Sequence, residues 1–299
     1  MVEQTCLGLL GLAGNYGRQN INEVKKCLQF VVKNFDLIDV STDYGIEYNL
    51  IEILKNTNIQ NSRSNFIYKV GCELKGSYSV KNLIKRTLSD IQVLGENNID
   101  SILFHKPSYE KLDSDMKFFK ELTRQMNNIK FGICCNNQAL YNYYSQNIDI
   151  KILQLAINPL DYASNVSFLD DAKSNGVIIQ ARSILSSGLL SGKYNDRKKF
   201  SDPLRYKYNM EPMRDVFLQR MRVVNEIYEY FLYEYSILKQ EMPEVLYSVF
   251  EQVPQIDIVI RGGSNFHQIK SNSRRRKIKN IDIVSIIQKM KHEWSCEYV

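Results

Sequence analysis

Residues 99–135 read IDSILFHKPSYEKLDSDMKFFKELTRQMNNIKFGICC, and this stretch decides the fold. A short apolar run from Ile99 to His105 is followed by a polar turn. Residues 114–127 then carry apolar side chains at helical spacing, and a second apolar run occupies Ile129 to Cys135. This order predicts a strand, a helix and another strand. Consecutive strands joined by a helix are typical of a parallel sheet.

The same alternation extends in both directions over the whole chain of 299 residues. Eight apolar runs predict strands at Cys6–Leu12, Asp36–Ser41, Phe66–Gly71, Ile99–His105, Ile129–Cys135, Ile152–Pro159, Val177–Ser183 and Ile256–Gly262. Helical patterns lie between them at Asn20–Asn34, Asn49–Thr57, Ser79–Gly95, Ser114–Asn127, Asn137–Gln146, Ser167–Ser174, a long stretch from Pro212, and Pro243–Val253. Eight strands with right-handed helical crossovers can close on themselves. We therefore predict an α/β fold, a (β/α)8 TIM barrel that forms a single domain over residues 1–299, with a C-terminal extra helix from about Asp282 to Trp294.

A doubly wound open sheet is the alternative with the same order of strands and helices. Such a sheet ordinarily carries a Gly-rich phosphate-binding fingerprint after its first strand. Gly8, Gly11, Gly14 and Gly17 recur there at every third position, which does not match that fingerprint. No acidic residue for a ribose follows at the expected distance, so the closed barrel is the favoured prediction.

Composition excludes several classes of protein. Hydrophobic residues make up 44 % and charged residues 24 % of the chain, which is typical of a globular protein and excludes collagen-like and mostly disordered chains. The net charge of +6 is small for a nucleic-acid binder. No apolar stretch approaches the roughly 18 residues that span a bilayer, and the N-terminus does not resemble a signal peptide. We expect a cytoplasmic protein without a nucleic-acid or membrane partner, and make no prediction about its oligomeric state.

The six cysteines include no C-x-x-C pair. Zinc knuckles and redox dithiols use such pairs, so we expect free buried thiols and no metal site.

Polar side chains end the inward rows of three consecutive predicted strands. Asp39, Lys69 and His105 each follow an apolar residue two positions earlier, and alternate residues of a strand face the same side. Tyr44 lies five residues after Asp39, on the loop that follows the same strand. Active sites of (β/α)8 barrels lie at the carboxyl ends of the strands. We therefore expect these four side chains to meet at the mouth of the barrel.

The four residue types can together transfer a proton to a carbonyl group. A phenol has an ordinary pKa near 10, and the neighbouring ammonium of Lys69 would lower it by stabilising the phenolate. A buried lysine stays charged if a carboxylate such as Asp39 lies beside it. His105 would hydrogen-bond the carbonyl oxygen and orient it. Taken singly, each residue fits a structural role better than a catalytic one; the four in this order favour catalysis.

The sequence resembles the aldo-keto reductase family over almost its whole length. The matching segments, in the family's order, are GLLGL at 8–12, IDVSTDYG at 38–45, YKVG at 68–71, IDSILFH at 99–105, Gln154 with NPL at 158–160, SGLLSGKY at 187–194, and IRGGSN at 260–265 with Gln268 and Asn272. The resemblance implies a barrel that binds NADPH, with NADH as the less favoured cofactor. It also implies hydride transfer to an aldehyde or ketone, a small-molecule carbonyl substrate. Tyr44 would be the proton donor, Lys69 and Asp39 its tuning pair, and His105 the orienting group.

The resemblance also assigns residues to parts of the cofactor. It places Gln154 at the nicotinamide amide, Gly188, Leu189 and Lys193 at the pyrophosphate, and Ser264, Gln268 and Asn272 at the adenosine end. Backbone amides of a Gly-rich turn and nearby cations suit a diphosphate on electrostatic grounds as well. Arg261 or Lys270 would pair with a 2′-phosphate. The cations from Lys193 to Lys207 could equally form a solvated loop.

Arg182 occupies a position where the family commonly has an aromatic residue that stacks on the nicotinamide. A planar guanidinium can stack in the same way, and it could instead meet an acidic substrate. In having arginine at this position, the sequence resembles a branch of the family connected with sugar metabolism. This resemblance indicates a sugar or nucleotide-sugar carbonyl as the substrate.

Two departures from the family support a second hypothesis, a catalytically weak regulatory barrel that senses NADP(H). Cys134 and Cys135 stand where the family has Ser-Asn, and a thiol is a weak hydrogen-bond partner. Tyr48 stands near where the family often has Glu. A third hypothesis, nucleic-acid binding through the basic run Arg274–Lys277, competes with a solvated surface turn.

Overall fold

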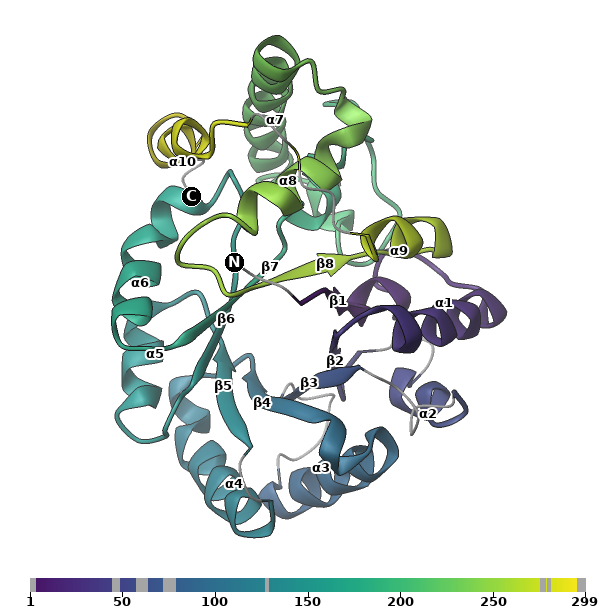
Figure 1. The fold of residues 1–299 in the computed structure, drawn as a ribbon, viewed down its shortest axis with the longest axis vertical. Helices are drawn as coiled ribbons and strands as arrows, with labels where there is room; N and C mark the ends of the chain where they lie inside the picture. The colour runs from purple at the N-terminus through teal and green to yellow at the C-terminus, as the bar shows by residue number, and fades with distance from the viewer. Residues whose placement is uncertain are drawn as a thin grey trace.

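The barrel predicted from the sequence is present in the computed structural model, which describes residues 4–44, 49–57, 64–71, 79–126, 129–274, 278 and 281–294. Eight parallel strands close in chain order (Figure 1). The strands are β1 (Cys6–Gly8), β2 (Leu37–Ser41), β3 (Asn65–Val70), β4 (Ile99–His105), β5 (Lys130–Cys134), β6 (Ile152–Ala156), β7 (Ile178–Arg182) and β8 (Ile258–Gly262). The closed order confirms the (β/α)8 prediction and excludes the open sheet. Tyr48 and Arg275–Lys277, on which two of the hypotheses draw, lie outside the described residues.

Helices surround the sheet on its outer side (Figure 1). They are α1 (Ile21–Asn34), α2 (Leu50–Lys55), α3 (Val80–Leu94), α4 (Leu112–Gln125), α5 (Gln138–Ser145), α6 (Tyr162–Ser174), α7 (Met213–Tyr235), α8 (Met242–Phe250), α9 (Phe266–Asn272) and α10 (Ile283–His292). The sequence pattern does not predict α9, because a helix of seven residues is too short to show helical periodicity. Helix α6 begins five residues earlier than its apolar pattern indicates. The predicted C-terminal extra helix is α10.

Short polar side chains fix where several helices begin. Each accepts a hydrogen bond from a backbone N–H of the first turn, which would otherwise lack a partner in the helix. These caps are Asn20 of α1, Asn49 of α2, Asn137 of α5, Asn265 of α9 and Asp282 of α10. Each of these helices therefore begins at a defined residue.

Two apolar layers fix the barrel. One fills its interior and includes Leu37, Ile67, Leu103 and Ile152, which point inward from four strands. The other lies between the sheet and the helices. Because the interior is packed with apolar side chains, polar inward residues come together above it, at the carboxyl ends of the strands.

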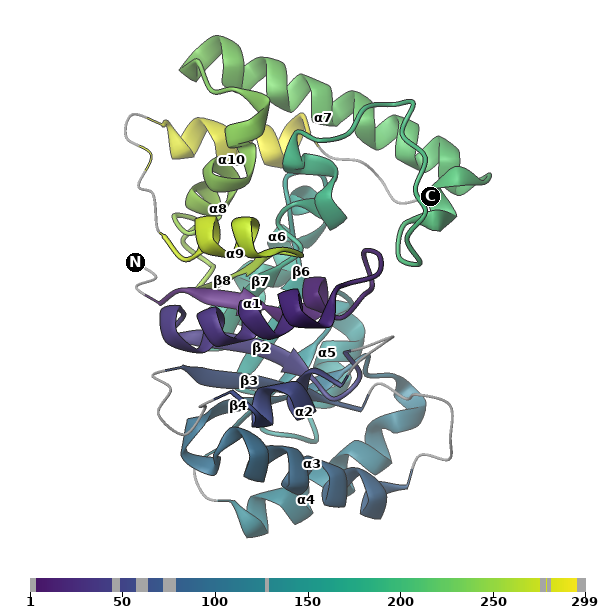
Figure 2. The ribbon, with the colours of Figure 1, turned by 90° about the vertical axis from the view of Figure 1, so that its right-hand side faces the viewer.

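Helices α7 and α10 lie together on one side of the barrel (Figure 2). Trp294, which follows α10, packs edge-on against Tyr230 of α7 with ring centroids 5.3 Å apart. Across the described ranges, no helix has the length and apolar character needed to cross a bilayer.

Candidate active site

A buried carboxylate, ammonium and phenol are in direct contact at the mouth of the barrel. Lys69 Nζ on β3 donates to Asp39 Oδ1 on β2 at 2.7 Å and to the Tyr44 hydroxyl at 2.6 Å. Asp39 and Lys69 are almost wholly buried, whereas Tyr44 retains 9 % exposure. Of the three, the phenol is therefore the group nearest to solvent and to an incoming substrate.

The pKa values of this cluster follow from burial and charge. Burial is the largest single effect and would lower the pKa of Lys69, but the charge of Asp39, together with smaller effects of Tyr44 and Cys134, outweighs it, so the pKa rises above its ordinary value and the ammonium stays charged. Burial raises the pKa of Tyr44 above its ordinary value, while the charge of Lys69 opposes the rise. The expected acidifying effect of Lys69 is thus present but smaller than the effect of burial. Tyr44 keeps its proton at neutral pH, as a proton donor must.

Gln154 on β6 completes the surroundings of the ion pair. Its Oε1 accepts from Lys69 Nζ at 3.2 Å, and its Nε2 donates to Asp39 Oδ2 at 2.9 Å and to Gln180 Oε1 at 3.1 Å. The side chain has no exposed surface. This arrangement does not support the contact with nicotinamide expected for Gln154, because both ends of its amide already bind protein groups below the surface.

His105, the last residue of β4, lies beside the phenol. Its ring and that of Tyr44 are edge to face, with centroids 5.9 Å apart. Ser41 Oγ lies 3.2 Å from His105 Nδ1. Burial, followed by the positive charges of Lys69 and Arg182, lowers the pKa of His105 to about 3. The imidazole is therefore neutral at physiological pH.

The low pKa of His105 predicts a measurable pH dependence of stability. The folded-state value lies below the ordinary value near 6.5, so stability present above pH 6.5 is lost as the pH falls from 6.5 towards 3. We expect a contribution of up to about 1 kcal/mol per pH unit, less than the full linkage slope because the ring is partly exposed. Urea denaturation of the wild type and of His105→Gln at pH 7, 6 and 5 measures the difference. His267→Gln, at an exposed position on α9, is the control that should keep the wild-type slope; equal slopes for wild type and His105→Gln would contradict the prediction.

Comparison with known proteins agrees with this geometry. The model of the aldo/keto reductase family matches residues 4–289. The chain belongs to the aldo/keto reductase family. It is accordingly an oxidoreductase that uses a nicotinamide cofactor to act on carbonyl compounds.

Two solved structures have the same fold as this aldo/keto reductase. A glycerol dehydrogenase from Gluconobacter oxydans has a TM-score of 0.70 and 16 % identity, over 98 % of this chain and 93 % of that chain. The holo form of an aldo-keto reductase from Bacillus halodurans has a TM-score of 0.71 and 17 % identity, over 97 % and 92 % of the two chains. No curated protein sequence matches the chain.

Arg182 and two cysteines border the catalytic cluster of this aldo/keto reductase. Arg182 ends β7, is partly exposed, and its Nη1 lies 3.4 Å from Ser183 Oγ. Cys134 Sγ, at the end of β5, donates to Gln154 Oε1 at 3.5 Å, and burial raises the pKa of Cys134 to about 11. Cys135 faces away from the barrel interior, where its Sγ contacts the backbone of Asn137. The two thiols therefore stay protonated on opposite sides of the sheet.

The loop after β7 presents a turn of left-handed backbone. Ser186, Ser187 and Gly188 have φ values of 46°, 55° and 93°. Ser186 N and Gly188 N donate to the carbonyl oxygens of Ser183 and Leu185, both at 2.8 Å, so these two amides already have partners and are not free to bind an anionic group such as a pyrophosphate. The side chain of Leu189 lies in the core, so only its backbone can face a ligand, and Lys193 is exposed.

The contacts of Arg205 change the interpretation of the loop that carries the cations from Lys193 to Lys207. Its guanidinium pairs with Asp202 and donates to the Tyr194 hydroxyl at 2.6 Å. It also lies over the ring of Tyr16, in the loop after β1, with 5.0 Å between Cζ and the ring centroid. The backbones meet as well, where Leu204 N donates to Asn15 O. At Arg205 the loop after β7 is therefore packed against the loop after β1. The hypothesis of a solvated loop applies only to Lys193 and the exposed cations near it.

The segment after β8 holds the residues expected at the adenosine end. Ser264 N and Oγ both donate to Gln268 Oε1, at 2.9 and 3.2 Å. Both side chains are partly exposed at the start of α9, in keeping with the expected contact. Gly11, after β1, lies against this segment so closely that a Cβ there would be 2.1 Å from Gly263 O. Only glycine fits at Gly11 without moving one of the two loops.

Arg261 and Asn272 have internal partners instead. The Arg261 guanidinium donates to Glu251 Oε1 at 2.7 Å and to the carbonyl oxygens of Asn272 and Arg274. Asn272 Nδ2 donates to Gly262 O at 2.7 Å. Both side chains therefore fasten α9 to β8, which argues against the expected contact of Arg261 with a 2′-phosphate and of the Asn272 amide nitrogen with adenosine. Of the two cations considered, the exposed Lys270 remains.

Two polar side chains of the cluster were not among the predicted residues. Ser41 contacts His105, and Gln180 contacts Gln154. The alternation of strand residues could have identified both, because Ser41 lies two positions after Asp39 and Gln180 two positions before Arg182.

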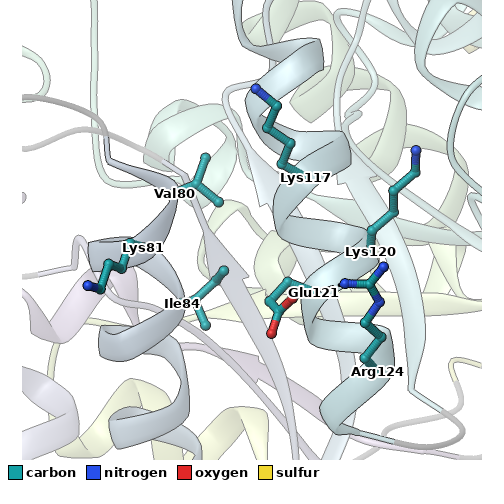
Figure 3. A pocket seen from close by; sticks show the side chains of 7 residues that line it. All are labelled: Val80, Lys81, Ile84, Lys117, Lys120, Glu121 and Arg124. Atoms are coloured by element: carbon teal, nitrogen blue, oxygen red, sulfur yellow. Dashed lines mark hydrogen bonds and ion pairs between the residues drawn. The ribbon is translucent and has the colours of Figure 1, made fainter.

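A surface hollow of about 530 Å³ lies between α3 and α4, on the outside of the barrel (Figure 3). Val80 and Ile84 line its apolar part, and the charged residues around it are Lys81, Lys117, Lys120, Glu121 and Arg124. None of the catalytic candidates lines it, so the hollow is separate from the candidate active site.

Proposed function

We propose that this chain reduces an aldehyde or ketone with NADPH, with Tyr44 as the proton donor. The contact of Lys69 Nζ with both the Tyr44 hydroxyl, at 2.6 Å, and Asp39 Oδ1, at 2.7 Å, is the observation that carries the proposal. This contact lies at the carboxyl ends of the strands, where barrels of this kind carry out their chemistry.

The hydrogen bonds of Lys69 orient the proton of Tyr44. An ammonium has three hydrogens, and Lys69 directs them to Asp39, Gln154 and Tyr44. The Tyr44 oxygen is therefore an acceptor towards Lys69, and its own hydrogen is available to a substrate oxygen. When that proton leaves, the phenolate lies 2.6 Å from a positive charge, which stabilises it. NADPH, when bound, supplies the hydride.

The loops after β7 and β8 fit a dinucleotide. The turn at Ser187 and Gly188 is the proposed place of the pyrophosphate, with Lys193 as a nearby exposed cation. Ser264 and Gln268 offer polar side chains to the adenosine end. Lys270 on α9 supports NADPH over NADH, because a 2′-phosphate adds negative charge.

A polyhydroxylated carbonyl compound, such as a sugar or nucleotide sugar, is the proposed substrate class. Arg182 at the rim can donate several hydrogen bonds to oxygens. The Gluconobacter protein with the same fold is a glycerol dehydrogenase, which also supports a substrate with several hydroxyl groups.

Thermal unfolding with added nucleotide tests cofactor binding before any substrate is known. A ligand that binds only the folded state at about 100 times its Kd stabilises that state by about 2.7 kcal/mol. For a barrel of this size we expect NADPH to raise Tm by about 5 °C, and NADH by less at the same concentration. If neither nucleotide changed Tm at millimolar concentration, the proposal would be wrong.

The alternative is a barrel that binds NADP(H) but has little activity, a sensor instead of a reductase. The observation in its favour is Cys134, whose protonated thiol lies where a better hydrogen-bond partner would support the cofactor. Nucleotide binding without oxidation of NADPH by a broad panel of aldehydes and ketones would support the sensor.

A further inference from the structure

We propose that Ser41 is a positioning residue that holds His105 in the tautomer with its proton on Nε2. The inference rests on the proposed function, because only that tautomer can donate a hydrogen bond from Nε2 to a carbonyl oxygen. Ser41 itself does not touch the substrate.

The contacts of Ser41 define a small network below the imidazole. Its side chain is 1 % exposed at the end of β2. Its Oγ lies 3.2 Å from His105 Nδ1 and 3.2 Å from the carbonyl oxygen of Lys69, and it accepts from Asp43 N at 3.3 Å. The hydroxyl has a single hydrogen, so it can donate a hydrogen bond to Nδ1 or to the carbonyl oxygen, but not to both.

The two choices give opposite tautomers of His105. If the hydroxyl donates to Lys69 O, then Nδ1 must carry the proton and donate to Oγ. The Nε2 lone pair would then repel a carbonyl oxygen at the mouth. If the hydroxyl donates to Nδ1, then Nε2 carries the proton and can bind that oxygen.

The backbone permits the second choice. Lys69 O already accepts a hydrogen bond from Thr42 N at 3.3 Å, so it does not depend on the serine hydroxyl. Among the described residues, Ser41 is the hydrogen-bond partner of the ring at Nδ1, and none of them hydrogen-bonds Nε2. Both choices give each buried group of the network a partner, and only the second, with the Ser41 hydrogen on Nδ1, leaves a free N–H for the substrate.

Nitrogen-15 NMR of the histidine rings tests the tautomer directly, without any substrate. The chain has only three histidines, so the His105 signals are assigned by their loss in His105→Gln. For the wild-type protein at pH 7 we expect a protonated Nε2 and an unprotonated Nδ1. A protonated Nδ1 would overturn the proposal, whether or not the protein reduces carbonyl compounds.

Ser41→Ala tests the serine itself. Without the hydroxyl, we expect the Nδ1 signal to move to the position of a ring nitrogen that accepts no hydrogen bond, or a population with protonated Nδ1 to appear. Ser41→Thr keeps a hydroxyl and should keep the wild-type signals. An Nδ1 signal that is the same in Ser41→Ala and the wild type would overturn the proposal, even if the variant were less stable.

Kinetics with any carbonyl substrate found add a second readout. Loss of one orienting hydrogen bond is expected to lower kcat about tenfold in Ser41→Ala, with less change in Ser41→Thr and none in the Kd of NADPH. If the NMR result holds but no substrate is reduced, the tautomer assignment stands and the reductase proposal fails.

Discussion

Replacement of Tyr44 by Phe is expected to lower kcat by about 10²- to 10⁴-fold, the usual loss when a general acid is removed. Phe keeps the ring and its packing beside His105 but lacks the hydroxyl that contacts Lys69 Nζ. The Kd of NADPH should change little, because the phenol is the proton donor and no part of the proposed cofactor loops. Steady-state kinetics and nucleotide titrations of wild type and variant measure both quantities.

Tyr16→Phe is a matched control on the neighbouring loop, after β1. Tyr16 stacks on Arg205 and lies in the loop after β1, and it is not among the hydrogen-bond partners of the Lys69 ammonium in the described part of the chain. Its loss should leave kcat within a few-fold of wild type. Turnover by Tyr44→Phe at the wild-type rate would show that the proton comes from another group.

Replacement of Asp39 by Asn is expected to destabilise the protein by about 3–5 kcal/mol, because it leaves the ammonium of Lys69 buried without its counter-ion. Asn has almost the same shape as Asp, so the loss reports charge and not volume. Chemical denaturation at pH 7 measures the change in free energy of unfolding.

Two further variants isolate the cause. The double variant Asp39→Asn/Lys69→Met removes both charges and should recover much of the loss. The surface pair Lys151–Asp149 has a similar N–O distance of 2.8 Å but is more than half exposed, so Asp149→Asn should cost less than about 1 kcal/mol. Equal costs for Asp39→Asn and Asp149→Asn would contradict a buried, uncompensated charge.

The repeating features of this molecule could be predicted from the sequence. Strand alternation has a period of two, and the barrel brings equivalent ends of all strands together. These two rules are enough to place Asp39, Lys69 and His105 at one mouth of the barrel. Tyr44 follows Asp39 by five residues and is placed on the adjoining loop. The eight strands follow from the same alternation of apolar runs and helical patterns.

Partners of single side chains could not be predicted in the same way. Gln154 binds Asp39, 115 residues earlier in the chain, and this contact occupies the amide that was expected to bind the nicotinamide. Arg261 meets Glu251 and the end of α9, a helix too short to recognise in the sequence. Such contacts depend on distances across the folded barrel, and local sequence patterns carry no information about these distances.

The amide of Gln154 joins opposite walls of the barrel. It extends from β6 to Asp39 on β2, which is four strands away in either direction around the closed ring. The separation of carboxylate and ammonium is therefore held in part by the diameter of the sheet and not by the rim loops alone. A substitution that widened the sheet at its far wall would alter the proton affinity of the phenol without touching any group that meets the substrate.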